Sequence, residues 1–328
     1  MSKQAESHGR GFCWLGNAER SRIARGKMGG DFNVWQLQES VVTTAVNAPP
    51  LPRSVRDVVV NGVRLRLEEE GSGTESVVFS HALVADRRMF DGQVAALRDG
   101  YRCIRYDHRG HGQSELPRET IVGMETMYDD AVALIEDLDL APCHWVGLSL
   151  GGLVGMRLAA RRPDLLRSAV LLETPPAARE RAVNRLQAGL SLVVLKVLGP
   201  RLAARVVLEP TMRRFYGSTF RRDPTRRDDY LAERASMAAR IQATSPAVVW
   251  GVLNRAPMSD QLGGIKVPTL VIVGDEDAAI PPARAKRVAS AIPQARFEIV
   301  RGAGHASTVD QPATVSALIA DFLDGLRR

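Results

Sequence analysis

The stretch Cys143–Arg161, CHWVGLSLGGLVGMRLAAR, decides what the rest of the chain can be. It begins with a short apolar run of β-type residues, passes through GLSLG at 147–151, and continues into an Ala-, Leu- and Met-rich run that favours a helix. The pattern predicts a strand, a sharp turn and a helix, with Ser149 at the apex. Gly147 and Gly151 remove side chains where strand and helix come closest, so that the serine oxygen can be exposed in a strained turn.

A serine at such a turn becomes a nucleophile only when other groups assist it. A base must remove the hydroxyl proton, and preorganised N–H donors must receive the charge that develops on the substrate oxygen. The start of the following helix supplies unpaired N–H groups at this place. The alternative interpretation is a glycine-rich strand–helix junction with an incidental serine, and the rest of the chain has to decide between the two.

Length and composition are those of an ordinary globular protein. The chain has 328 residues, 45% hydrophobic and 25% charged, which suits one large α/β domain with an insertion or two smaller domains. No apolar run approaches the roughly 20 residues that span a bilayer, and the first 30 or so residues lack the apolar region of a secretory signal. We therefore expect no membrane partner.

Charge and cysteine content bear on the cellular location and on the partners to expect. The three cysteines form no C-x-x-C pair, so reduced thiols and a cytoplasmic location are the simplest expectation. The net charge of +7 invites a nucleic-acid interpretation, but the arginines are dispersed and no basic face with interleaved aromatic residues is evident. A solvated arginine-rich surface is favoured, and we expect no nucleic-acid partner.

Strand-like and helix-like segments alternate along most of the chain. Asn61-Gly62 predicts a tight turn between two β-rich runs within Asp57–Glu70. Further strands are predicted at 76–80, 101–106, 168–172, 269–273 and 296–300, and helices at 90–97, 126–138, 282–291 and 312–326. Such alternation predicts an α/β fold with a mostly parallel central sheet and helices on both of its faces.

Two segments depart from this alternation. Residues 1–52 show no sustained periodicity and end in the stiff run APPLP, so we expect an N-terminal extension that is disordered or loosely docked. Residues 176–261 lack strand patterns and are rich in helix-forming residues, which predicts a helical lid inserted between two strands. The core then comprises residues 53–175 and 262–328.

The strand–G-x-S-x-G–helix arrangement resembles the α/β-hydrolase fold family, over roughly residues 55–326. In that family the nucleophile, the acid and the histidine follow one another along the chain. His305, in the run GAGH just past the last predicted strand, is the histidine that follows Ser149. The resemblance therefore implies that Ser149 is the nucleophile and His305 its base. The later Asp310-Gln311-Pro312 resembles the family's usual Glu-x-Pro.

The resemblance also implies an orienting acid. Residues 274–281, GDEDAAIP, match the family's Gly-x-x-Asp pattern followed by proline, which selects Asp277, with Asp275 as the competing candidate. The family's oxyanion hole implies the backbone N–H groups of Leu150 and Leu83. Here Ala82 stands where the family usually has glycine, and if that position needs a positive φ, alanine costs about 1 kcal/mol or more.

A second family landmark is matched by residues 107–114, DHRGHGQS. Its close-set aspartate and histidines suggest a metal or acid–base site, but the resemblance implies a loop that is structural and holds the neighbouring oxyanion loop. The sequence contains no phosphate-binding loop, dinucleotide fingerprint or metal-ligand spacing. We therefore expect no cofactor and no metal.

The function implied is a serine hydrolase that cleaves carboxylic esters or lactones through an acyl-enzyme. Leu, Val and Ala are frequent in the predicted lid, which favours substrates with an apolar group. An enol-lactonase, a perhydrolase-type haloperoxidase and a carbon–carbon bond hydrolase remain open on the same fold. A non-catalytic ligand receptor using the same pocket is the alternative from another class. We expect a monomer or a homodimer.

Overall fold

The computed structural model describes residues 53–175 and 206–327, all within one compact unit that runs from Pro50 to Arg328. The predicted N-terminal extension, residues 1–52, lies outside the described residues, and so does the first part of the predicted lid, residues 176–205.

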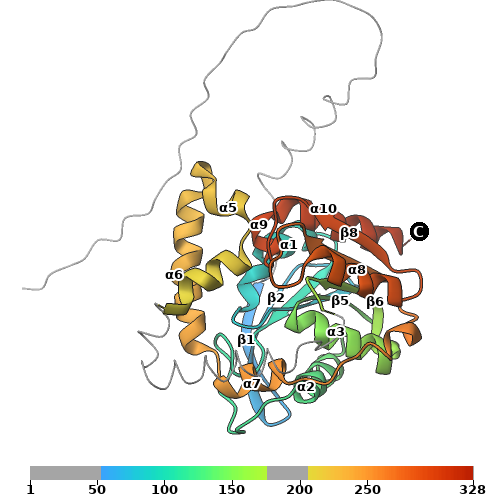
Figure 1. Ribbon diagram of the computed structural model, residues 1–328. Helices are drawn as coiled ribbons and strands as arrows, with labels where there is room; N and C mark the ends of the chain where they lie inside the picture. Colours follow the sequence, from blue (N-terminus) through green and yellow to red (C-terminus); the bar gives the residue numbers. More distant parts are fainter. Residues whose placement is uncertain (1–52, 176–205, 328) are drawn as a thin grey trace, which may run out of the picture. The chain divides into compact units, whose positions relative to one another are not determined.

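An eight-stranded sheet forms the centre of this unit, in the order β1-β2-β4-β3-β5-β6-β7-β8 (Figure 1). The pairs β1–β2 and β2–β4 are antiparallel, and every other neighbouring pair is parallel. The predicted fold class is therefore confirmed. The strands are β1 (Arg53–Val60), β2 (Val63–Glu70), β3 (Ser76–Ser80), β4 (Arg102–Tyr106), β5 (Cys143–Leu148), β6 (Leu166–Leu172), β7 (Thr269–Gly274) and β8 (Arg296–Val300).

The hairpin β1–β2 forms where the Asn-Gly pair predicts it. Asn61 has φ 47° and Gly62 has φ 75°, the left-handed conformation that a two-residue hairpin turn requires at both positions. The strand β1 begins four residues earlier than expected, at Arg53. It is an edge strand with mostly exposed side chains, so hydrophobic alternation does not mark its start.

Helices cover both faces of the sheet because alternate strand residues point to opposite sides. One buried cluster joins strand residues such as Val78 and Trp145 to helices α2, α3 and α8. A second cluster joins Val77 and Phe79 to α1 and α10. The helices that cover the sheet are α1 (Asp91–Leu97), α2 (Met124–Asp137), α3 (Leu150–Arg161), α8 (Pro282–Ala291), the short α9 (Ser307–Asp310) and α10 (Pro312–Gly325). The 3₁₀ turn η2 (Arg87–Phe90) comes directly before α1.

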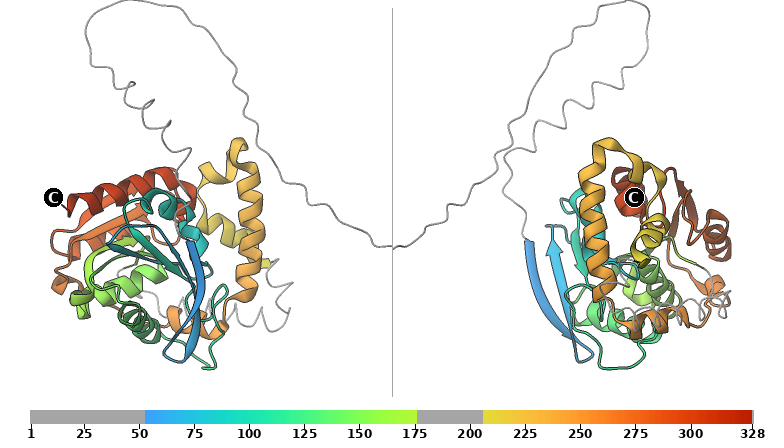
Figure 2. Two further views of the ribbon diagram at one scale, coloured as in Figure 1. Left: turned by 180° about the vertical axis from the view of Figure 1, so that it is seen from behind. Right: turned by 60° about the vertical axis from the view of Figure 1, so that its left-hand side comes forward.

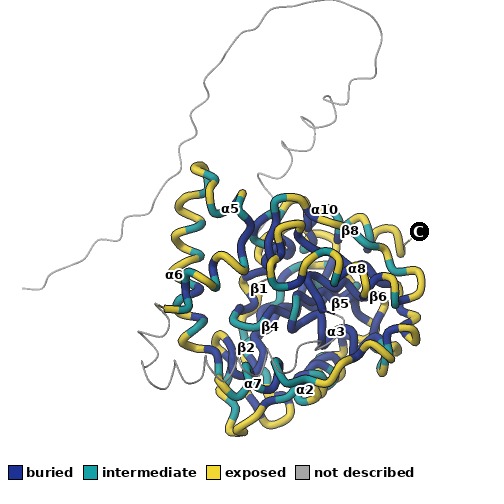
Figure 3. Tube along the Cα trace, in the orientation of Figure 1, coloured by how far each residue is buried: buried dark blue, intermediate teal, exposed yellow. Residues whose placement is uncertain are grey.

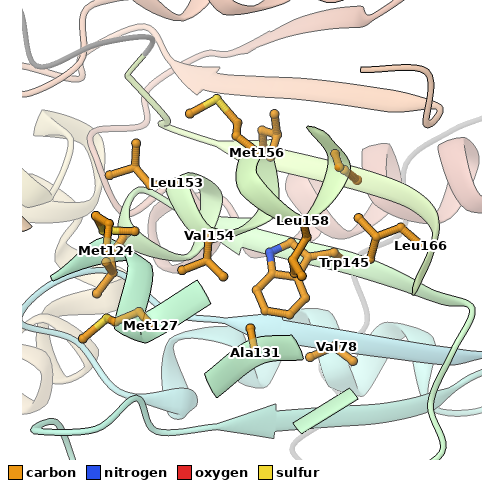
Figure 4. Close-up of a cluster of buried hydrophobic side chains, with 14 of the residues drawn as sticks. Val78, Met124, Met127, Ala131, Trp145, Leu153, Val154, Met156, Leu158 and Leu166 are labelled. Carbon is orange, nitrogen blue, oxygen red and sulfur yellow. The ribbon is translucent and has the colours of Figure 1, made fainter. Parts of the chain in front are cut away.

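Among the described residues, Trp145 is the largest fully buried side chain, and it lies in β5 beneath α3 (Figure 4). Its ring packs among residues of α2, α3 and the neighbouring strands, including Ala131, Val154 and Leu158. The indole nitrogen donates a hydrogen bond to the carbonyl of Gly151, 3.0 Å away. The core is thereby joined directly to the turn that carries Ser149.

The described residues between β6 and β7 are helical or irregular. Residues 206–215 form a helix, followed by α5 (Ser218–Arg222), α6 (Arg227–Ala243) and α7 (Pro246–Leu253). The long helix α6 runs beside the sheet and carries many exposed residues (Figures 2 and 3). None of the helices in the described ranges is long and apolar enough to span a bilayer.

Candidate active site

Ser149 stands between β5 and α3 in a backbone conformation that few non-glycine residues adopt. Its φ is 51° and its ψ is −100°, and its N–H donates to the carbonyl of Leu172 at the end of β6, 2.8 Å away. A side chain at Gly151 would overlap the carbonyl group of Ser80, and one at Gly147 would overlap that of Gly151. The glycines therefore permit the close approach of β3, β5 and α3 that presents the serine at the carboxyl edge of the sheet.

His305 and Asp277 meet at the same edge of the sheet. His305 follows β8, Asp277 follows β7, and the imidazole Nδ1 lies 2.8 Å from the carboxylate Oδ2. The other carboxylate oxygen accepts the N–H groups of Ala279 and Ile280, at 2.7 and 2.8 Å, which holds Asp277 in one orientation. An ionised carboxylate only accepts, so Nδ1 carries the ring proton and the lone pair of Nε2 remains available as a base.

The two acids next to Asp277 have other partners. Asp275 accepts the N–H of Gly302 at 2.8 Å, and Glu276 accepts the N–H and hydroxyl of Ser218 at 2.5 and 2.8 Å. Of these three neighbouring acids, Asp277 is the one that hydrogen-bonds His305. The catalytic roles of Ser149, Asp277 and His305 stay predictions. Within the described residues no hydrogen bond joins the Ser149 hydroxyl to the His305 ring, a contact that unliganded enzymes often leave long.

The loop after β3 carries the predicted second oxyanion donor, Leu83. It is tied to the serine turn by a 3.1 Å hydrogen bond from the Gly151 N–H to the carbonyl of His81. The positive φ lies not at Ala82 but at Val84, where φ is 58°. The backbone of Ala82 is therefore not in the left-handed region, and the strain of a positive φ is at the β-branched Val84 instead.

The loop after β3 is supported by packing at Val84. The side chain of Val84 packs against a buried cluster that includes Leu208, Met212 and Tyr216, and this packing offsets its strained backbone. The predicted first donor, the N–H of Leu150, lies in the opening turn of α3, where a helix provides no carbonyl partner.

The loop 107–114 has the structural role that the resemblance implies. Its Asp107 carboxylate accepts the N–H groups of Arg87 and Gln113, at 2.8 and 2.9 Å, and pairs with the Arg87 guanidinium. His81 and His111 are buried, which lowers their pKa values to about 4 and about 3, so both are neutral near pH 7. Among the described residues, no group of three or more His, Cys, Asp or Glu side chains is placed to hold a metal ion.

Glu173 is a buried acid that the sequence interpretation missed. It follows β6 with φ 45°, and neither carboxyl oxygen has a hydrogen-bond partner among the described residues. Burial, and then the neighbouring Asp277 carboxylate, raise the pKa of Glu173 well above its usual range. This direction favours the neutral acid, which places no second negative charge beside Asp277. Its signal in the sequence is an acid placed directly after the apolar run SAVLL.

Phe215 is a second residue that sequence patterns did not mark. Its ring meets the His305 imidazole edge-on, with centroids 5.3 Å apart and an interplanar angle of 80°. His305 is only 4% exposed, and Phe215 forms part of its cover.

A cavity of about 540 Å³ lies between α6 and the core. Its lining includes Arg226 and Arg240 but none of the three predicted catalytic residues.

Comparisons with known proteins agree with the fold. The family model described as "alpha/beta hydrolase fold" matches residues 75–312. A protein of Mycobacterium tuberculosis named as a candidate non-heme bromoperoxidase, BpoC, is 30% identical over 272 residues, covering 81% of this chain and 99% of its own. The enol-lactonase 3-oxoadipate enol-lactonase 1 of Acinetobacter baylyi is 26% identical over 253 residues, covering 77% and 90%.

Solved structures with a similar fold include an enol-lactonase and an esterase. The enol-lactonase from Burkholderia xenovorans is 28% identical with a TM-score of 0.72, over 82% of this chain and all of the other. A thermophilic esterase from Thermogutta terrifontis is 26% identical with a TM-score of 0.72, over 84% of this chain and all of the other. The protein belongs to the α/β-hydrolase fold family, and its relatives in that family include proteins named as hydrolases.

Proposed function

We propose that this protein is a serine hydrolase that cleaves carboxylic esters or lactones. The observation that carries the proposal is the buried His305–Asp277 hydrogen bond, at the sheet edge where the strained Ser149 turn also ends. A base oriented by a carboxylate and a serine on a sharp turn are two of the parts that acyl transfer to water requires.

The reaction would proceed in two halves. The Ser149 oxygen attacks the carbonyl carbon while His305 Nε2 takes its proton, and the N–H groups of Leu150 and Leu83 receive the oxyanion. The alcohol leaves with the proton from His305, and an acyl group stays on Ser149. Water, deprotonated by His305, then attacks the acyl carbon and releases the acid. For a lactone, the alcohol and the acid are two ends of one product.

The choice of ester or lactone draws on the relatives named as an enol-lactonase and an esterase. The buried apolar cluster of Leu208, Met212 and Phe220, close to Val84 and Ala306, supports a substrate with an apolar group. The test is turnover of p-nitrophenyl esters and simple lactones of graded chain length by the protein and by Ser149→Ala. We expect a loss of about 10³-fold or more in the variant. Binding without turnover in the unaltered protein would favour a receptor instead.

A second candidate is perhydrolysis, which the 30% identical relative named as a candidate bromoperoxidase favours. Hydrogen peroxide would replace water in the second half of the reaction, and the acyl-enzyme would yield a peracid that oxidises bromide. Bromination of monochlorodimedone in acetate, peroxide and bromide measures this activity. Bromination that exceeds ester hydrolysis, and that Ser149→Ala abolishes, would favour the second candidate.

A further inference from the structure

The segment Phe215–Ser218, which we name the cap turn, joins the last residue of the helix 206–215 to the first residue of α5 and touches both loops of the candidate site. The carbonyl of Phe215 accepts the N–H of Ala306, the residue after His305, at 2.8 Å. Ser218 donates through its N–H and its hydroxyl to Glu276, the residue before Asp277. The cap turn therefore contacts the immediate neighbours of both members of the His305–Asp277 pair.

The cap turn and the His305 loop pack backbone against backbone. A Cβ atom added at Gly217 would lie 2.6 Å from the carbonyl oxygen of Gly302, and one added at Gly304 would lie 2.7 Å from the nitrogen of Gly217. No side chain separates the two segments at these points, so a shift of one displaces the other without a flexible group to absorb it.

Asp310 holds this contact together through one oxygen atom. Its Oδ2 accepts the N–H of Gly217 at 2.8 Å and the N–H of Gly304 at 2.6 Å, so a single carboxylate bridges the cap turn and the residue before His305. The residue is 1% exposed, so these two hydrogen bonds are shielded from water. Arg226 adds a parallel tie, because its guanidinium donates to the carbonyls of Val309 and Asp310, at 2.9 and 2.7 Å.

We propose that Asp310 is a positioning residue, whose carboxylate clamps the cap turn onto the His305 loop and so holds the imidazole against Asp277 and toward Ser149. The inference rests on the proposed function for its kinetic consequence, although the clamp itself is a geometric feature. It acts through Gly304 and the cap turn and does not touch the reacting atoms.

The surroundings of Asp310 act on its pKa in opposite directions. Burial raises its pKa to about 7, while the two N–H bonds and Arg226 favour the charged form. The other ionisable groups that act on it or on which it acts are Glu276, Glu173 and Tyr216. Its second oxygen, Oδ1, has no partner among the described residues and can take a proton, which weakens the bonds made by Oδ2.

The experiment compares Asp310→Asn and Asp310→Glu with a matched control, Asp223→Asn. The Asp223 carboxylate also accepts two bonds, from the N–H and hydroxyl of Thr225, but both stay within the turn between α5 and α6 and do not reach the His305 loop. The first readout is the downfield proton NMR signal of the His305 Nδ1–H bonded to Asp277, assigned by its loss in His305→Gln. The second readout is kcat and KM for the best p-nitrophenyl ester.

We expect Asp310→Asn to shift or broaden the His305 signal and to lower kcat about 10- to 100-fold with little change in KM, because a misplaced base costs rate rather than binding. Asp310→Glu, which keeps the charge, should restore most of both readouts, and Asp223→Asn should change neither. A folded Asp310→Asn with an unchanged signal and unchanged kcat overturns the proposal, and so does an equal effect of Asp223→Asn.

Two further outcomes remain decisive. If Asp310→Asn does not fold by circular dichroism, Gly217→Ala perturbs the same contact from the cap side and is judged by the same two readouts. If the unaltered protein hydrolyses no ester, the proposed function fails, and the His305 signal alone still decides whether Asp310 positions the ring.

Discussion

The imidazole Nδ1 of His305 lies 2.8 Å from the Oδ2 of Asp277, although the two residues follow different strands and are 28 positions apart in the chain. Both side chains are nearly fully buried, and the second oxygen of Asp277 is held by two backbone N–H groups. The pair is thus prearranged before any substrate arrives, which is the condition under which an orienting carboxylate is effective.

Replacing Asp277 by Asn should lower kcat for ester hydrolysis by about 10⁴-fold, because the amide stabilises the wrong imidazole tautomer and no imidazolium. Asp275→Asn is the matched control, since that acid stands two residues away and bonds the N–H of Gly302 instead of the ring. We expect it to lose less than about tenfold. Steady-state kinetics of the two variants decide the assignment, and a larger loss in Asp275→Asn would reverse it.

Gly151→Ala should destabilise the protein by about 3 kcal/mol or more, because the added methyl group overlaps the buried carbonyl of Ser80 and the backbone of β3 or α3 must shift. Gly264→Ala is the control, because a Cβ atom there meets no other atom within 4 Å and the residue's φ is not positive. Urea unfolding of both variants measures the difference. Equal midpoints would show that the strand–helix contact is looser than described.

Acid should weaken the fold partly through His144, which lies at the opposite end of β5 from Ser149. Burial lowers its pKa from 6.5 to about 4, and its Nδ1 lies 2.8 Å from the Ser168 hydroxyl. Between these two pKa values the unfolded chain binds a proton that the folded protein does not, so stability falls as pH drops below about 6.5. Asp310, with its raised pKa, has the opposite sign: its contribution decreases as pH rises from about 4 to 7.

The variant His144→Gln isolates the contribution of His144 to the pH dependence of stability, because glutamine keeps a hydrogen-bonding group but does not titrate. Moving from pH 7.5 to pH 5 should cost the unaltered protein about 2 kcal/mol more than the variant. Urea midpoints at the two pH values provide the measurement. If both proteins lose the same stability, His144 is not held neutral in the fold.

Local patterns in the sequence predicted the regular elements well. The helix Pro282–Ala291 and the strand Arg296–Val300 have the predicted bounds, and the hairpin forms at Asn61-Gly62. These features depend on turn chemistry and hydrophobic periodicity, which act over a few residues. The edge strand β1 was placed less well, because its exposed positions carry no alternation that marks where it begins.

Contacts between distant segments were harder to predict. The left-handed residue of the loop after β3 is Val84 rather than Ala82, and no propensity predicts that a β-branched residue takes this conformation. The packing of Leu208 and Met212 on Val84 makes it tolerable. Glu173 was overlooked for a similar reason, since an acid at a strand end is usually solvated and only the surrounding fold buries it.

The sequence by itself determined the strand–turn–helix around Ser149 and the succession of strands and helices along the chain, because glycine placement and hydrophobic periodicity are local properties. Only the tertiary structure decided which of three neighbouring acids meets His305, and that Asp310 joins the cap turn to the His305 loop. Those contacts link residues far apart in the chain, and their geometry depends on how loops and helices pack at the sheet edge rather than on the preferences of any one segment.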